Sequence, residues 1–215
     1  MKNKELFLTD KSIAIKLINR YDYPFEVLPN INEFIIALGN TLNDSYTKVG
    51  EDIWISKSAT IEKSALIIGP CIIDEGAQIR HNAYIRGNVI IGKNAVVGNS
   101  CEIKNSILFD EAKAPHFNYV GDSILGYKSH IGAGVILSNL KSDESNVVIK
   151  GKEVINTGLK KVGSFLGDKV EVGCNSVLNP GTIVGVNTSI YPLSNVRGVI
   201  DSNKIVKTNQ IVDKI

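Results

Sequence analysis

The chain has 215 residues, with 24 lysines and arginines against 22 acidic residues and a formal net charge of +2. This even balance argues against a global field that recruits nucleic acid or an anionic membrane, so any anion site must be local. The N-terminus lacks the apolar run of a signal peptide and no stretch is long enough for a membrane span, so we expect a cytoplasmic protein.

Residues 1–50 predict a small helical cap or docking segment rather than a catalytic domain. Asn30 can act as the N-cap of a helix that ends near Gly39. The apolar stripe of this helix consists of Ile31, Phe34, Ile35, Leu38 and Leu42. Because a solenoid must cover the backbone groups at its first coil, a covering role suits this segment.

From residue 55 to residue 109, every sixth residue is a large apolar one. The ten anchors are Ile55, Ile61, Ile67, Ile73, Ile79, Ile85, Ile91, Val97, Ile103 and Phe109. Compact residues follow four positions later, namely Ala59, Ala65, Cys71, Ala77, Ala83, Val89, Ala95, Cys101 and Ile107, until Lys113 breaks the rule. A period of six fits neither a helix nor one strand, and it predicts short parallel strands joined by tight turns. This is the hexapeptide signature of a parallel β-helix, an all-β solenoid.

The same repeat sets the expected boundaries of the solenoid at residues 51–198. The anchor pattern fails at Pro115 and Gly121 and resumes at Leu125. A charged loop interrupts it at residues 138–165, and loops of this length are usually functional or disordered. Nineteen anchors predict about six coils, since one coil takes three hexads. Residues 199–215 are read as a polar C-terminal tail.

Neither a disulfide framework nor a metal site is predicted. Cys71, Cys101 and Cys174 cannot all pair within the chain, and two of them occupy compact hexad positions. This favours buried free thiols in a reducing compartment. The three histidines are spaced by 35 and 14 residues, which does not place them on one face and predicts no zinc site.

Arg86 and Lys104 lie 18 residues apart and each follows an anchor directly, so they should stack on the outside of consecutive coils. Stacked strands lie about 4.8 Å apart. Two cations at this distance repel each other unless an anion or a carboxylate lies between them. The pair is therefore either two surface charges or a cradle for a phosphate group, which a forked guanidinium suits.

His116 lies in the first interruption of the hexads, within AKAPHFNYVGD, and Tyr119 follows three residues later. Histidine is the usual general base near neutral pH, although a single histidine in a loop is more often structural.

Residues 86–191 resemble the C-terminal acetyltransferase domain of the bifunctional bacterial N-acetylglucosamine-1-phosphate uridyltransferase/glucosamine-1-phosphate acetyltransferase. The resemblance rests on VGNSCEIKNS with Lys104, HFNYVGDSILG with His116 and Tyr119, and HIGAGVILSN. The chain is also similar to the stand-alone hexapeptide proteins named after that enzyme, which are related to UDP-N-acetylglucosamine pyrophosphorylase. The resemblance implies a homotrimeric left-handed β-helix that binds acetyl-CoA and an amino-sugar phosphate in clefts between subunits.

The resemblance also implies roles for individual residues. His116 matches the general base, and the implied substrate contacts are Arg86, Lys104, Tyr119, His130 and Asn139. The implied lining of the coenzyme A groove is Ala133, Cys174 and Pro192. His130 replaces an asparagine of that family and the loop after Asn139 is longer, so the acceptor sugar stays open. No glycine-rich nucleotide loop opens the chain, so we expect no uridyltransferase activity from this chain by itself.

These features predict an acetyl-CoA-dependent N-acyltransferase that acts on an amino-sugar phosphate or a nucleotide-linked amino sugar, in UDP-N-acetylglucosamine-type metabolism. A backbone N–H of residues 131–134 would stabilise the oxyanion. The alternative is a non-catalytic trimeric scaffold that binds a sugar nucleotide or a separate nucleotidyltransferase. Fold alone does not decide between them. The joint presence of Arg86, Lys104, His116 and Tyr119 favours the enzyme, whereas His130 and the long loop favour the scaffold.

Overall fold

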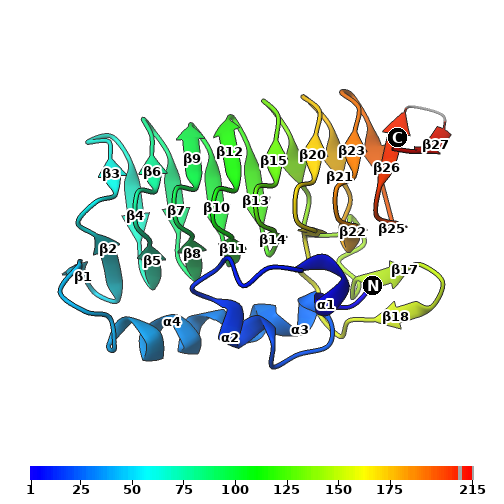
Figure 1. Cartoon of the computed structure of the whole chain (residues 1–215). Helices are drawn as coiled ribbons and strands as arrows, with labels where there is room; N and C mark the ends of the chain where they lie inside the picture. The colour runs from blue at the N-terminus through cyan, green and yellow to red at the C-terminus, as the bar shows by residue number, and fades with distance from the viewer. Residues whose placement is uncertain (208–209, 215) are drawn as a thin grey trace.

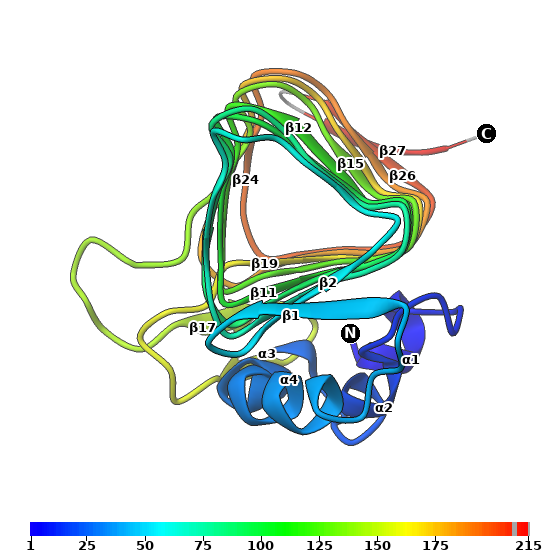
Figure 2. The same cartoon turned by 90° about the vertical axis from the view of Figure 1, so that its left-hand side faces the viewer.

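The computed structural model describes residues 1–207 and 210–214. The chain winds through three sheets of short parallel strands (Figure 1), which form the sides of a triangular prism (Figure 2). Seen from the side of the first coil, the chain passes counter-clockwise from β2 to the sheet of β12 and on to that of β24 while it recedes (Figure 2). The β-helix is therefore left-handed, and the predicted fold class is confirmed.

The strands fall into three sheets and one separate hairpin. Sheet 1 contains β1 (Tyr46–Gly50), β2 (Ile53–Ser56), β5 (Cys71–Ile73), β8 (Val89–Ile91), β11 (Ser106–Leu108), β14 (Ile124–Leu125), β19 (Ser164–Leu166), β22 (Thr182–Val184) and β25 (Val199–Ile200). Sheet 2 contains β3 (Thr60–Ile61), β6 (Gln78–Ile79), β9 (Val96–Asn99), β12 (Lys113–His116), β15 (His130–Ile131), β20 (Glu171–Val172), β23 (Ser189–Ile190), β26 (Lys204–Lys207) and β27 (Gln210–Asp213). Sheet 3 contains β4 (Leu66–Ile68), β7 (Tyr84–Arg86), β10 (Glu102–Lys104), β13 (Tyr119–Gly121), β16 (Ile136–Leu137), β21 (Val177–Leu178) and β24 (Asn195–Val196).

The number of coils exceeds the six predicted, because sheet 3 alone contributes seven strands. Sheets 1 and 2 have nine strands each, and in each sheet one terminal strand, β1 or β27, pairs antiparallel with its neighbour. These end strands cover edges that would otherwise expose unpaired backbone groups. The coil also continues past residue 198, since β25 and β26 extend sheets 1 and 2. Residues 208, 209 and 215 of the predicted tail lie outside the described residues.

The tenth anchor is Leu108, not Phe109. Leu108 pairs with Ile91 of the previous coil and is buried in the solenoid core. Phe109 instead belongs to the cluster outside sheet 1, where its ring stacks on Phe7 with 4.9 Å between the ring centroids. Ile107, which the hexads place in a compact interior position, lies in the same outer cluster.

A shortened corner explains this shift. From the anchor Ile103 to the next anchor there are five residues instead of six, and Asn105 in that corner adopts a φ of 45°. The next two anchors therefore come one residue early. Ala114 and Val120 are the buried residues, in place of the expected Pro115 and Gly121. The compact partner likewise moves to the buried Ala112, which is why Lys113 breaks the sequence rule.

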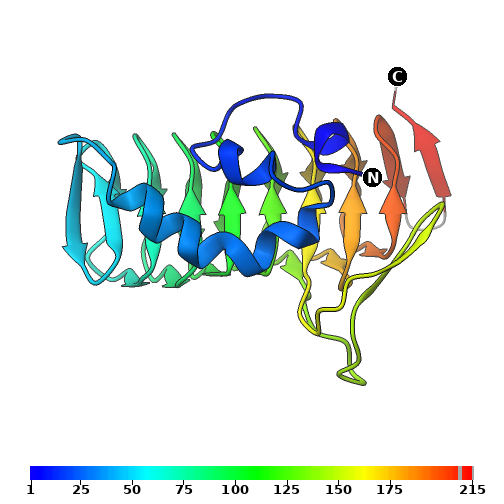
Figure 3. The ribbon, with the colours of Figure 1, turned by 90° about the horizontal axis from the view of Figure 1, so that it is seen from below.

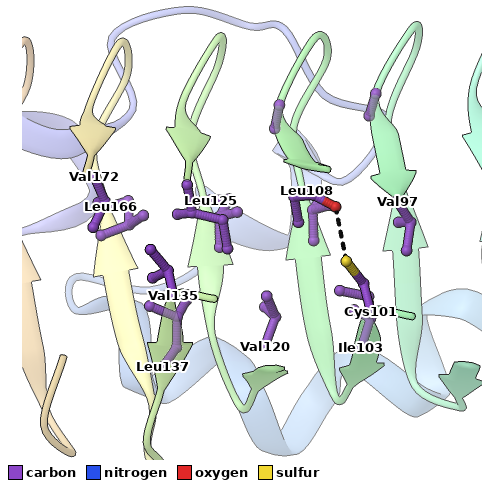
Figure 4. Packing of buried hydrophobic residues seen from close by; sticks show 14 of the residues in the cluster. Val97, Cys101, Ile103, Leu108, Val120, Leu125, Val135, Leu137, Leu166 and Val172 are labelled. Carbon is purple, nitrogen blue, oxygen red and sulfur yellow. Dashed lines mark hydrogen bonds between the residues drawn. The ribbon is translucent and has the colours of Figure 1, made fainter. Parts of the chain in front are cut away.

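The interior of the prism is filled by the anchors and their compact partners (Figure 4). Cys71 and Cys101 are buried free thiols, as predicted, whereas Cys174 is exposed. The Cys101 thiol donates a hydrogen bond to the Ala114 carbonyl at 3.1 Å (Figure 4). Burial raises the pKa of the Cys71 thiol to about 12 and also raises the pKa of Cys101. These two thiols are therefore protonated and inert at neutral pH.

The N-terminal segment lies along the outward face of sheet 1 (Figure 3). Its helices are α1 (Asn3–Leu6), α2 (Ile15–Ile18), α3 (Pro24–Val27), a 3-10 turn (Leu28–Asn30) and α4 (Ile31–Gly39). The predicted stripe of α4 packs onto sheet 1, with Ile31 and Ile35 fully buried. A Cβ at Gly39 would come within 2.4 Å of the Trp54 ring, so glycine permits this close approach. None of the described helices is long and apolar enough to cross a membrane.

The long loop is an ordered hairpin. Strands β17 (Val148–Lys150) and β18 (Val154–Asn156) pair antiparallel. Val147 and Ile149 are buried at its base, in the same outer cluster as the N-terminal helices. The hairpin projects beside the corner between sheets 3 and 1 (Figure 2).

Candidate active site

The corner between sheets 2 and 3 carries His116 and the three residues predicted to line the coenzyme A groove. The His116 carbonyl accepts a hydrogen bond from the N–H of the residue after Ala133, at 3.0 Å. The same bond recurs in the next two coils. The Asn175 N–H donates to the Ala133 carbonyl at 2.8 Å, and the Leu193 N–H donates to the Cys174 carbonyl at 2.9 Å. Because this bond repeats from coil to coil, His116, Ala133, Cys174 and Pro192 occupy equivalent positions of four consecutive coils.

Asn118 holds this corner in place. Its buried side-chain oxygen accepts the N–H of His116 at 3.1 Å, and its amide donates to the Gly132 carbonyl at 2.8 Å. Asn118 was not predicted from the sequence. The signal was its position four residues after the true anchor Ala114, where the hexads usually have a compact apolar residue.

The turn that follows β15 offers one free backbone donor. Gly132 donates to the Val172 carbonyl and Gly134 to the His116 carbonyl, at 2.7 and 3.0 Å. The N–H of Ala133 has no hydrogen-bond acceptor within residues 1–207 and 210–214. The corner therefore presents an exposed imidazole and, one coil further, an unused N–H donor.

Arg86 and Lys104 end consecutive strands of sheet 3, β7 and β10, and stack as predicted. Each has a carboxylate beside it. Arg86 donates to Glu102 at 2.6 Å, and Lys104 lies 3.3 Å from Asp122. The hydrogen bond from Arg86 to Glu102 raises the pKa of the guanidinium. The repulsion expected between the two cations is therefore relieved by carboxylates within the chain.

Asp122 joins Lys104 to two further predicted residues. Asp122 is 4% exposed, and its carboxylate also accepts a hydrogen bond from the side-chain amide of Asn139. A Cβ at Gly121 would meet the Tyr119 hydroxyl at 2.5 Å and the Asn139 amide at 2.8 Å, so these two side chains converge over the glycine. Burial raises the pKa of the Tyr119 hydroxyl. Lys104, Tyr119, Asp122 and Asn139 thus form one polar cluster on sheet 3.

His130 does not join this cluster within one chain. It lies in β15 of sheet 2, paired in register with Lys113 and Glu171. Its Nδ1 lies 2.8 Å from the Glu171 carboxylate. Sequence reasoning also missed Glu102 and Asp122, although both follow from the register, since Glu102 precedes Lys104 on one strand and Asp122 follows Gly121.

Two curated relatives have names that agree with the resemblance drawn from the motifs. The bifunctional sugar-1-phosphate nucleotidylyltransferase/acetyltransferase of Sulfurisphaera tokodaii is 40% identical over 91 residues, which cover 41% of this chain and 22% of that protein. The bifunctional protein GlmU of Methanococcus maripaludis is 40% identical over 89 residues, which cover 40% of this chain and 21% of that protein. The match thus spans about a fifth of each relative's length.

Among solved structures, the chain is similar to that of a single-site mutant of AntD, an N-acyltransferase from Bacillus cereus, in complex with dTDP-4-amino-4,6-dideoxyglucose and coenzyme A. It matches with a TM-score of 0.40 and 16% identity, over 80% of this chain and 91% of that one.

The family model of the GMPPB C-terminal domain matches residues 67–185. This range lies within the coil and includes His116, Ala133, Cys174 and the polar cluster of sheet 3. Since the match covers more than half of the 215 residues, the chain belongs to the family of GMPPB C-terminal domains.

Proposed function

We propose that the protein is an N-acyltransferase that moves an acetyl group from acetyl-CoA to the amine of a phosphorylated or nucleotide-linked amino sugar. The observation that carries the proposal is the corner that aligns His116 with Ala133, Cys174 and Pro192, directly before the polar cluster of sheet 3. The name of the Sulfurisphaera tokodaii relative, which includes an acetyltransferase, supports the same reaction class.

In the proposed reaction the sugar amine attacks the thioester carbonyl of acetyl-CoA. A C–N bond forms, the C–S bond breaks, and His116 accepts the amine proton and returns it to the departing thiolate. The free N–H of Ala133 would stabilise the oxyanion, and its being an unused donor one coil from His116 supports this role. Asn118 acts as a positioning residue, since it bonds both the His116 backbone and the turn that carries Ala133.

On the acceptor side, Arg86 and Lys104 would bind the phosphate while Tyr119 and Asn139 orient the sugar. The phosphate must compete with Glu102 for Arg86, so binding replaces one charge-assisted bond by another. The implied homotrimer would place His130 against the acceptor from a neighbouring subunit, because its own sheet does not carry the polar cluster. Uridyltransferase activity is not part of the proposal.

The test is release of free coenzyme A by the purified protein with a panel of amino sugars, their 1-phosphates and their nucleotide-linked forms. Turnover with one phosphorylated class, and a product heavier by one acetyl group, is the expected result. Binding of these ligands without turnover of any of them would instead identify the non-catalytic scaffold.

A further inference from the structure

A pocket of about 560 Å³ lies where the long hairpin meets the corner between sheets 3 and 1. The coil contributes Ser138, Asn179 and Arg197 to it, and the hairpin contributes Val148 and Lys150. Its volume lies in the range of small-molecule sites. It shares no lining residue with the polar cluster of sheet 3 or with the His116 corner.

The walls of this pocket are fixed by packing. Val147 and Ile149 are buried beside Lys150, and a Cβ at Gly181 would come within 2.8 Å of the Val147 side chain. A Cβ at Gly198 would lie 2.7 Å from the Lys150 carbonyl. Both glycines have positive φ, at 78° and 81°, so the coil accepts the hairpin through positions that suit glycine.

The pocket combines cations with an apolar surface. Lys150 and Arg197 have no carboxylate within salt-bridge distance in the described part of the chain, whereas Lys141 is paired with Asp143 at 3.4 Å. Arg197 donates to the Asn179 side chain at 3.2 Å, which orients its guanidinium. The apolar part of the lining is Leu140, Val148 and Pro180. Two unpaired cations next to apolar side chains suit the phosphates and the base of a nucleotide.

The pocket continues the column of residues that carries Lys104. The strand registers place Lys104, Gly121, Ser138, Asn179 and Arg197 in equivalent positions of consecutive coils. Ser138 is therefore one coil, or roughly 4.8 Å, from Gly121, over which Tyr119 and Asn139 converge. A nucleotide-linked sugar held there would place its diphosphate in the pocket, whereas a sugar 1-phosphate would place its phosphate on the other side of Gly121, towards Lys104 and Arg86.

We propose that this pocket binds the nucleoside diphosphate of a nucleotide-linked amino sugar, so that the acceptor is the nucleotide sugar rather than the sugar 1-phosphate. This inference rests on the proposed function and specifies its substrate. Coenzyme A also contains an adenosine diphosphate, but the predicted groove for it follows the opposite edge of sheet 3, along Ala133, Cys174 and Pro192. The pocket is accordingly assigned to the acceptor.

The test is calorimetric titration of the full chain with UDP, uridine and coenzyme A. UDP should bind more tightly than uridine. Arg197→Gln and Lys150→Gln should each weaken UDP binding by about tenfold, while coenzyme A affinity stays unchanged. Both side chains are exposed, so the variants should fold. Lys160→Gln is the matched control, since Lys160 is an exposed lysine of the same loop outside the pocket lining.

UDP affinity that is unchanged in Arg197→Gln would overturn the proposal, as would no UDP binding at all. Loss of coenzyme A affinity instead would assign the pocket to the coenzyme. If UDP binds as expected but no amino sugar is acetylated, the proposed function fails and the pocket stands. If sugar 1-phosphates are acetylated as fast as nucleotide sugars while UDP does not bind, the function stands and the pocket assignment fails.

Discussion

At the scale of single residues, the proposed general base is His116, at the end of β12. His116→Ala should lower turnover by about 10²–10⁴-fold, because it removes a positioned general base. Its exposed side chain leaves the packing of the coil intact, so acetyl-CoA affinity and the unfolding midpoint should change little. His81→Ala is the control, since His81 lies at the same corner two coils earlier. Equal activity in the two variants would return His116 to a structural role.

The pairing of Arg86 with Glu102 makes a two-sided prediction about anion binding. Arg86→Ala should weaken binding of a sugar phosphate by about tenfold or more, because a charge-assisted contact is lost. Glu102→Gln should strengthen it, since the guanidinium no longer has a competing carboxylate. Calorimetry with the phosphorylated and unphosphorylated sugar measures both changes, and Lys93→Ala breaks a comparable ion pair with Glu75 elsewhere. Affinities that do not depend on the phosphate in wild type would refute the cradle.

The three thiols should differ in reactivity. A maleimide should modify Cys174 first, because it is exposed, whereas Cys71 and Cys101 are buried with raised pKa values. Saturating acetyl-CoA should slow the modification if Cys174 lines the coenzyme groove. Mass spectrometry of the labelled peptides reports the order, and Cys174→Ser should remove the fast phase. Labelling at an unchanged rate with acetyl-CoA would take Cys174 out of the groove.

Among the elements, one buried carboxylate joins the N-terminal segment to the coil, in addition to their apolar packing. Asp168 accepts hydrogen bonds from the backbone N–H of Leu8 and of Tyr127, both at 2.9 Å. Asp168→Asn should therefore destabilise the fold by about 1–3 kcal/mol, because an amide cannot accept every one of these bonds. Urea unfolding measures this difference.

The same carboxylate predicts a pH dependence. Burial raises the pKa of Asp168 above its unfolded value of 3.8. The folded protein then binds more protons than the unfolded chain, so this contribution to stability is full below pH 3.8 and is lost as the pH rises through the folded pKa. The cost of Asp168→Asn should accordingly shrink as the pH rises from 3.8 through the folded pKa of Asp168. Asp10→Asn, at an exposed site nearby, is the control. A cost that grows with pH would contradict the raised pKa.

For the whole molecule, the proposal requires a homotrimer, and light scattering should give three times the 23.3 kDa mass of the chain. Phe117, next to His116, is 61% exposed at the corner between sheets 2 and 3, as an apolar side chain that a subunit contact would bury. Phe117→Asp should weaken the trimer, whereas Leu8→Asp, at a site that is 63% exposed on the N-terminal segment, should not. A stable monomer at micromolar concentration would remove the inter-subunit active site.

The sequence by itself determined the solenoid, because a six-residue period can satisfy both core packing and strand pairing only when the chain turns after every strand. It also determined the apolar face of α4 and the stacking of Arg86 on Lys104, since both depend only on spacing. The roles of His116, Ala133, Cys174 and Pro192 follow from the resemblance, whereas the backbone bonds of the corner are what align the four residues.

Only the tertiary structure decided which of Ile107, Leu108 and Phe109 faces the core, because all three are apolar and hydrophobicity does not reveal a corner shortened by one residue. It also decided that carboxylates accompany Arg86 and Lys104, and that the charged loop is a hairpin which encloses a pocket against the coil. These features depend on contacts between residues of different coils, and the hexad period contains no information about such contacts.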